Sequence, residues 1–130
     1  MAKIEKFENI ESWKKARELS RMIYKITATG EFAGDFGLRD QVRRAAVSIM
    51  SNIAEGFERD GNKEFLHFLS IAKGSTGELR SQLYVALDAN FITRAEFQNL
   101  YDRCAETGRL LAGFMKYLAQ SPLRGQKYKT

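Results

Sequence analysis

Residues 38–57 read LRDQVRRAAVSIMSNIAEGF, and this stretch decides the fold. At 100° per residue, its apolar side chains fill a continuous sector of roughly 200°, wider than the ~100° stripe that a surface helix needs. The sector consists of Leu38, Val42, Ala45, Ala46, Val47, Ile49, Met50, Ile53, Ala54 and Phe57. Such a helix either sits deep inside a bundle or buries a second side against another subunit. We favour the second interpretation and expect a homo-oligomer.

Three further segments have apolar residues at spacings of three and four, which is typical of amphipathic helices. They cover about residues 11–28, 62–89 and 93–119. Gly30 and Gly34 interrupt the apolar pattern after the first segment. Because short connections favour antiparallel neighbours, the sequence predicts an all-α protein, an antiparallel up-down-up-down four-helix bundle.

Four residues mark the expected ends of the later helices. Asn62 is the expected N-cap of the helix over about 62–89, and Asn90 is expected to stop it. Thr93 and Glu96 have the spacing of a capping box, in which each side chain pairs with the backbone N–H of the other residue.

Length, charge and cysteine content indicate the class of protein. With 130 residues the chain fits a single domain, and its formal net charge of +5 permits contact with nucleic acid without requiring it. It shows neither a membrane span nor a signal peptide, and its single cysteine cannot form an internal disulfide, so we expect a cytoplasmic protein and no membrane partner. We expect an N-terminal arm over 1–10, the bundle over 11–119 and a basic disordered tail over 120–130.

Several blocks of sequence resemble a known family. They are DFGL at 35–38, QVRRAAVS at 41–48, SNIAEG at 51–56, EF at 64–65, FL at 68–69, IA at 71–72, GS at 74–75 and EL at 78–79. These blocks resemble the four-helix-bundle proteins encoded by 23S rRNA intervening sequences, over about residues 7–118. Met50 departs from the pattern, because the family usually has a proline between Ile49 and Ser51.

The resemblance implies a four-helix bundle that assembles as a homopentameric ring and has no known enzymatic activity. It also implies kinship with the accessory variability determinant of diversity-generating retroelements, a similar pentameric bundle that binds nucleic acid and a reverse transcriptase.

The first helical segment carries the best candidate for a nucleic-acid-binding surface. Its basic residues recur at spacings of three, four and four, so they line the side opposite the apolar one: Lys14, Arg17, Arg21 and Lys25. Such a row can follow a phosphate backbone. Taken singly it also fits an ordinary solvated helix, since Glu11 and Glu18 lie within reach as ion-pair partners.

A polar row runs along the segment at 38–57, beside its apolar sector. It consists of Gln41, Arg44, Ser48, Asn52 and Glu55. Buried polar groups must be paired, so we interpret this row as a hydrogen-bond network along a helix or subunit interface rather than a ligand site.

The sequence offers no group of side chains suited to catalysis or to metal binding. A di-iron bundle needs two Glu-x-x-His motifs, and the chain has only Glu64 to His67, so His67 is expected at the surface or at an interface. Cys104 lies on a core seam, where cysteine behaves as a small hydrophobic residue. The stretch Gly74-Ser75-Thr76-Gly77 falls within a helix, where we expect its small residues to let a neighbouring helix approach closely. The sequence predicts no enzyme, no cofactor and no metal.

The sequence therefore favours a non-enzymatic homo-oligomer that binds RNA or DNA electrostatically, without sequence specificity. Two alternatives stay open. One is an accessory subunit that binds a reverse transcriptase in a diversity-generating retroelement, and the other is a structural oligomer with a protein partner only.

Overall fold

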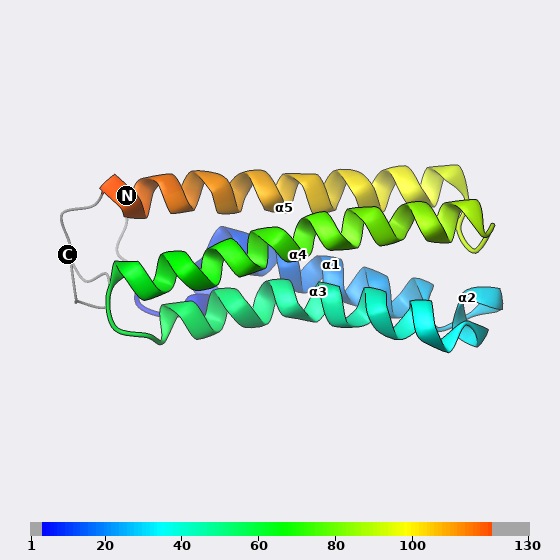
Figure 1. The fold of residues 1–130 in the computed structure, drawn as a ribbon, viewed down its shortest axis with the longest axis horizontal. Helices are drawn as coiled ribbons and strands as arrows, with labels where there is room; N and C mark the ends of the chain where they lie inside the picture. Colours follow the sequence, from blue (N-terminus) through cyan, green and yellow to red (C-terminus); the bar gives the residue numbers. More distant parts are fainter. Residues whose placement is uncertain (1–3, 121–130) are drawn as a thin grey trace.

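The computed structural model describes residues 4–120, and its regular elements are all helices (Figure 1). Their order is η1 (Phe7–Asn9, a single 3-10 turn), α1 (Glu11–Ile26), α2 (Gly30–Gly34), α3 (Phe36–Phe57), α4 (Asn62–Asp88) and α5 (Arg94–Gln120). The four long helices lie side by side, α3 between α1 and α4, and α5 between α4 and α1. The prediction of an all-α bundle is confirmed.

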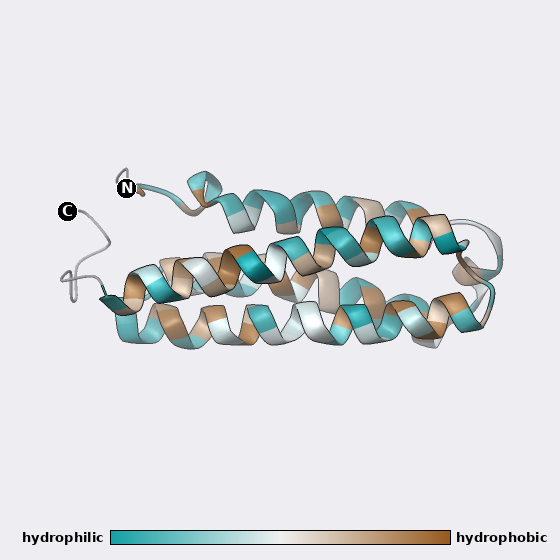
Figure 2. Ribbon diagram, turned by 90° about the horizontal axis from the view of Figure 1, so that it is seen from above, coloured by the Kyte–Doolittle hydropathy of each residue, from teal (hydrophilic) through white to brown (hydrophobic). Residues whose placement is uncertain are grey.

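The core follows the predicted apolar positions of each long helix. Every helix mixes hydrophobic and hydrophilic residues along its length, and α1 is coloured largely as hydrophilic (Figure 2). The side chains that are completely buried include Ala16 and Ile23 of α1, Phe65 and Leu79 of α4, and Leu111 of α5. The periodicity of the sequence therefore identified the inward side of each helix.

Helix α3 sits deep inside the bundle, because it packs against α1, α2, α4 and η1. Six residues of its broad apolar sector are buried within the single chain: Val42, Ala45, Ala46, Ile49, Ile53 and Phe57. Of the remainder, Val47 is 36% exposed. The intramolecular packing thus accounts for most of the sector, and the width of the sector by itself does not require a second subunit.

The predicted ends of α4 and α5 are right in two places and wrong in one. Thr93 N–H donates to Glu96 Oε1 at 2.8 Å and Glu96 N–H donates to Thr93 Oγ1 at 3.1 Å, as a capping box requires. Asn90 ends α4 with a φ of 63°, and Phe91 N–H donates to Ala86 O at 2.9 Å, which completes a Schellman motif.

Asn62 is not the N-cap of α4, contrary to the prediction. Gly61 holds that position with a φ of 87°, and Asn62 is the first helical residue. Its side chain is buried, and Nδ2 donates to the Leu118 carbonyl of α5 at 3.1 Å. The asparagine therefore joins two helices instead of capping one.

The connection before α3 is more ordered than the glycines suggested. Its residues form the short helix α2, and the ring of Phe32 is buried against Phe91, with ring centroids 5.4 Å apart. Asp35 then caps α3 by accepting from Leu38 N–H at 3.0 Å. Helix α3 continues without a break through Met50.

The predicted N-terminal arm and C-terminal tail lie only partly within the described residues. Part of the predicted N-terminal arm packs on the bundle: Ile10 is buried, and Phe7 contacts the ring of Trp13 with centroids 5.2 Å apart. Helix α5 includes Gln120, and the rest of the predicted tail, residues 121–130, lies outside the described residues.

Close approach between helices occurs at Gly56 and not at the predicted glycines. A Cβ at Gly56 would lie 2.7 Å from Phe68 Cβ and 2.9 Å from Phe65 Cδ1 of α4. A Cβ at Gly74 would meet nothing within 4 Å, and one at Gly77 would meet only the end of the Arg80 side chain. In the stretch 74–77 the close contacts are made by Ser75, whose Oγ lies 2.9 Å from Ser48 Oγ of α3, and by Thr76, whose Oγ1 would lie 3.1 Å from a Cβ at Gly108 of α5. The expectation therefore holds for Ser75 and Thr76 and fails for Gly74 and Gly77.

We predict that Gly56→Ala destabilises the protein by about 1–3 kcal/mol, because the new methyl group overpacks the contact between α3 and α4. Gly113→Ala on α5 is the matched control: its Cβ meets no atom within 4 Å, so the change should add about 0.5–1 kcal/mol through helix propensity. Urea unfolding followed by circular dichroism measures both. Equal stability of the two variants would contradict the close approach at Gly56.

Candidate nucleic-acid interface

The basic row predicted on the first helix lies on the exposed side of α1. Lys14, Arg17, Arg21 and Lys25 are all exposed. The guanidinium of Arg17 lies 6.0 Å from the ring centroid of Trp13. The structure therefore brings the four predicted side chains together on one side of one helix.

The acidic residues of α1 leave most of this row unpaired. Glu11 pairs with Lys14 at 3.8 Å, as expected from their spacing. Glu18, the other expected partner, pairs instead with Arg103 of α5. Within residues 4–120, Arg17, Arg21 and Lys25 make no ion pair, so three of the four cations keep their charge available to a ligand.

Three residues of the polar row on α3 make side-chain hydrogen bonds or ion pairs. Ser48 Oγ lies 2.9 Å from Ser75 Oγ of α4, and Asn52 Nδ2 donates to Ser48 O and Oγ at 2.8 and 3.0 Å. Glu55 pairs with Arg59 on its own helix at 3.0 Å. The row therefore connects α3 to α4 at its centre.

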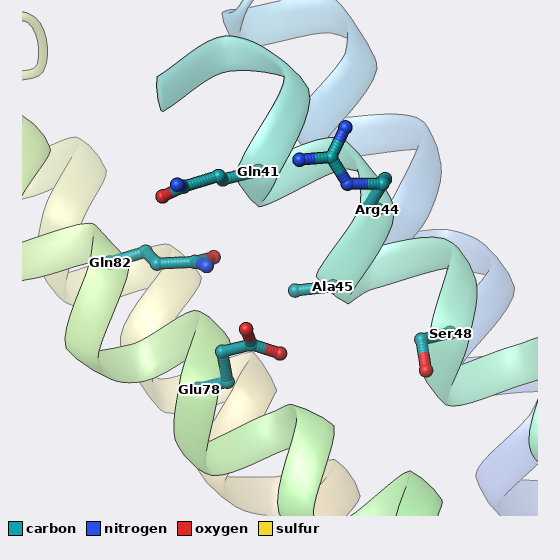
Figure 3. Close-up of a pocket in the computed structure, with 6 residues that line it drawn as sticks. All are labelled: Gln41, Arg44, Ala45, Ser48, Glu78 and Gln82. Atoms are coloured by element: carbon teal, nitrogen blue, oxygen red, sulfur yellow. The ribbon is translucent and has the colours of Figure 1, made fainter. Parts of the chain in front are cut away.

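The other two residues of the row, Gln41 and Arg44, line a surface hollow of about 430 Å³ between α3 and α4 (Figure 3). Glu78 and Gln82 extend into it from α4. Gln82 Oε1 is buried and has no hydrogen-bond partner in the described part of the chain. A buried amide oxygen left unpaired costs free energy.

Sequence reasoning missed Glu78 and Gln82. They are four positions apart on α4 and thus share a side of it, but nothing local indicates that this side meets Gln41 and Arg44. The register between α3 and α4 is set by tertiary packing.

Cys104 is buried, as predicted, and is unsuited to nucleophilic chemistry. Its Sγ donates to the Thr76 carbonyl at 3.1 Å. Burial raises the pKa of the thiol to about 12, and the positive charge of Arg80 offsets only part of that rise. Since the thiolate is the reactive form, the thiol is inert in the folded protein.

The remaining candidate residues offer no metal centre. Glu64 and His67 are both exposed on α4. Within residues 4–120, no group of three or more His, Cys, Asp or Glu side chains is arranged to hold a metal ion. In the same range, every helix is too short or too polar to cross a membrane.

Comparison with known proteins gives a family match and a structural match. The model of a family described as "23S rRNA-intervening sequence protein" matches residues 8–113. A crystal structure of a protein of unknown function from the S23 ribosomal protein family of Bacteroides thetaiotaomicron has the same fold, with a TM-score of 0.75 and 24% sequence identity. The match covers 81% of this chain and 98% of that one. No curated protein matches the chain.

We predict that Cys104 does not react with a thiol reagent such as DTNB in the native protein near pH 8, and reacts fully after denaturation in guanidinium chloride. The raised pKa and burial together remove both the thiolate and its access. The absorbance of the released thionitrobenzoate measures the reaction. Fast labelling of the folded protein would show that this part of the core opens readily.

Proposed function

The chain belongs to the 23S rRNA-intervening sequence protein family, and on this basis we propose that it is a non-enzymatic homo-oligomer that binds RNA or DNA electrostatically. The observation that carries the proposal is the absence of ion-pair partners, within residues 4–120, for Arg17, Arg21 and Lys25 on the exposed side of α1.

Unpaired surface cations are suited to phosphates. A cation that is already paired with a carboxylate must lose that partner before it binds phosphate, whereas a free cation releases only the counterions of the nucleic acid. Here Glu18 is directed to Arg103 on α5, away from the row. The formal net charge of +5 favours the same ligand.

We propose that the binding is independent of sequence. Sequence readout needs side chains that form paired contacts with base edges in a groove. A single row of long cationic side chains along one helix contacts phosphates, which position a nucleic acid but carry no sequence information.

We further propose that the long helices run up-down-up-down and that the chains assemble as a homopentameric ring through the outer surface of α4. Support comes from Ile71 and Val85 of α4, which are 40% and 52% exposed, and from the unpaired Gln82 Oε1 in the hollow nearby. A ring would repeat the basic row in each subunit and make weak contacts multivalent.

The alternative role, as an accessory subunit of a reverse transcriptase in a diversity-generating retroelement, uses the same basic surface. The two roles are distinguished by the genes around this one. A neighbouring reverse-transcriptase gene favours the accessory subunit, and location inside a 23S rRNA gene favours the first proposal.

The proposed contact with phosphates is tested by reversing charge in the row. We predict that the double variant Arg17→Glu/Arg21→Glu binds RNA and DNA more weakly and lowers the slope of log affinity against log salt by about 2, since each lost phosphate contact removes about one released counterion. Fluorescence anisotropy across a salt series measures both quantities.

The matched control for that variant is Arg109→Glu/Lys116→Glu on α5, where both residues are also exposed. It has the same net charge, so it should weaken binding only slightly if the row on α1 is the contact. If the two double variants bind alike, a general charge effect replaces the proposed interface.

We predict that the protein sediments as an oligomer, with five times the 14.8 kDa of one chain for a pentamer. Ile71→Asp should shift the mass toward the monomer and leave helicity unchanged, because Ile71 is exposed in the single chain. Tyr117→Asp on α5, at an equally exposed position, is the control and should keep the oligomer. A parent protein that sediments at 14.8 kDa would contradict the proposed assembly.

A further inference from the structure

A second surface hollow, of about 570 Å³, lies between α1 and α3, beside the basic row. It is lined by Tyr24, Asp40, Arg43, Arg44, Val47 and Ser48. Its volume falls within the ~300–1,000 Å³ range of small-molecule and cofactor sites. The two apolar members of the lining, Tyr24 and Val47, are 45% and 36% exposed. The hollow therefore presents a solvent-accessible aromatic ring next to an aliphatic side chain.

Tyr24 is held in place by an anchored arginine. The Arg43 guanidinium lies 4.5 Å from the centroid of the Tyr24 ring, and Arg43 Nε donates to Thr27 Oγ1 at 2.8 Å. Thr27 is itself fully buried, and its hydroxyl donates to the Ile23 carbonyl at 2.7 Å. This chain of contacts fixes the ring and the guanidinium together, so little side-chain freedom remains to be lost when a ligand binds.

The hollow adjoins the unpaired cations of α1. Tyr24 follows Arg17 by seven positions and Arg21 by three, so the three side chains share one side of the helix. Arg44, in the lining, makes no ion pair within residues 4–120. The one acidic lining residue, Asp40, pairs with Arg39 at 3.0 Å, which offsets its charge.

We infer that this hollow receives an unstacked base of a single-stranded nucleic acid, which stacks on the Tyr24 ring while Arg17 and Arg21 contact the adjoining phosphates. The inference rests on the proposed function and specifies its substrate class. An aromatic ring beside a positively charged track is the arrangement with which proteins bind single strands without sequence preference, because every base has a face that stacks.

A duplex cannot use this site, since its bases already stack on one another and offer only their edges in the grooves. The row alone treats single and double strands alike as phosphate ligands. The ring adds affinity only where a base is free to leave its neighbours, so the site favours single strands.

The test compares one labelled strand, its duplex with the complementary strand, and an abasic strand of the same length, by fluorescence anisotropy. The parent protein should bind the single strand more tightly than the abasic strand by about tenfold. Tyr24→Leu should lose about tenfold in affinity for the single strand and keep its affinity for the duplex and the abasic strand. Tyr24→Phe should bind as the parent does.

Tyr84→Leu is the matched control, because Tyr84 on α4 is 50% exposed and packs against Phe97, 4.8 Å away, outside this hollow. It should leave all three affinities unchanged. Circular dichroism verifies that each variant is folded, and Tyr24→Phe provides the comparison if Tyr24→Leu unfolds.

The failures of the two proposals are distinct. If the parent binds none of the three probes, the nucleic-acid function and the stacking site both fall. If the parent binds all three and Arg17→Glu/Arg21→Glu weakens each, while Tyr24→Phe and Tyr24→Leu bind as the parent does, the phosphate contacts stand and the stacking site is overturned.

Discussion

Helix α3 carries apolar side chains over a wide sector, and the other helices are arranged so that these side chains are buried. Its apolar sector is too broad for one neighbour, so α1, α2, α4 and η1 all pack against it. The contact with α4 is close enough that Gly56 has no room for a methyl group. With the core side of α3 occupied in this way, its polar row is left at the boundary with α4, where Ser48 meets Ser75.

The same packing decides which charges remain available at the surface. Because α1 lies between α3 and α5, its acidic residue Glu18 faces α5 and pairs with Arg103. Ion pairs between exposed side chains contribute little to stability, commonly about 0–1 kcal/mol. This one matters because it engages the carboxylate that the spacing offers to the basic row as a partner. The sequence of α1 alone fits an ordinary solvated helix, but in the bundle its exposed side is cationic.

The sequence predicted what depends on short-range order. Periodicity located the long helices and their buried sides, and the spacing of Thr93 and Glu96 gave a capping box that the structure contains. Contacts that depend on which residues of a neighbouring helix lie opposite could not be predicted from the sequence. Asn62 has the residue type of an N-cap, yet its amide reaches Leu118, fifty-six residues away. Gly74 and Gly77 suggested close packing, but which residue of α4 faces a neighbour is fixed by the register of the helices.

The candidate site, too, could be predicted only where a single helix supplies its residues. The row on α1 was visible because one helix supplies all of it. The hollow lined by Gln41, Arg44, Glu78 and Gln82 was only half visible, since two helices contribute to it. The ring of Tyr24 and the guanidinium of Arg43 come together across α1 and α3, and no local pattern joins them.

The length of the row on α1 sets a scale for any strand laid along it. Lys14 and Lys25 stand eleven positions apart, which at 1.5 Å per residue corresponds to about 17 Å of helix. Phosphates of one strand in a double helix follow one another at about 3.4 Å along the axis, and those of an unstacked strand stand farther apart, so a single chain spans at most about five of them. The footprint of one copy is therefore a handful of nucleotides. On a long strand, each bound copy would cover only a few nucleotides. Neighbouring copies would compete for uncovered nucleotides, whatever the sequence of those nucleotides.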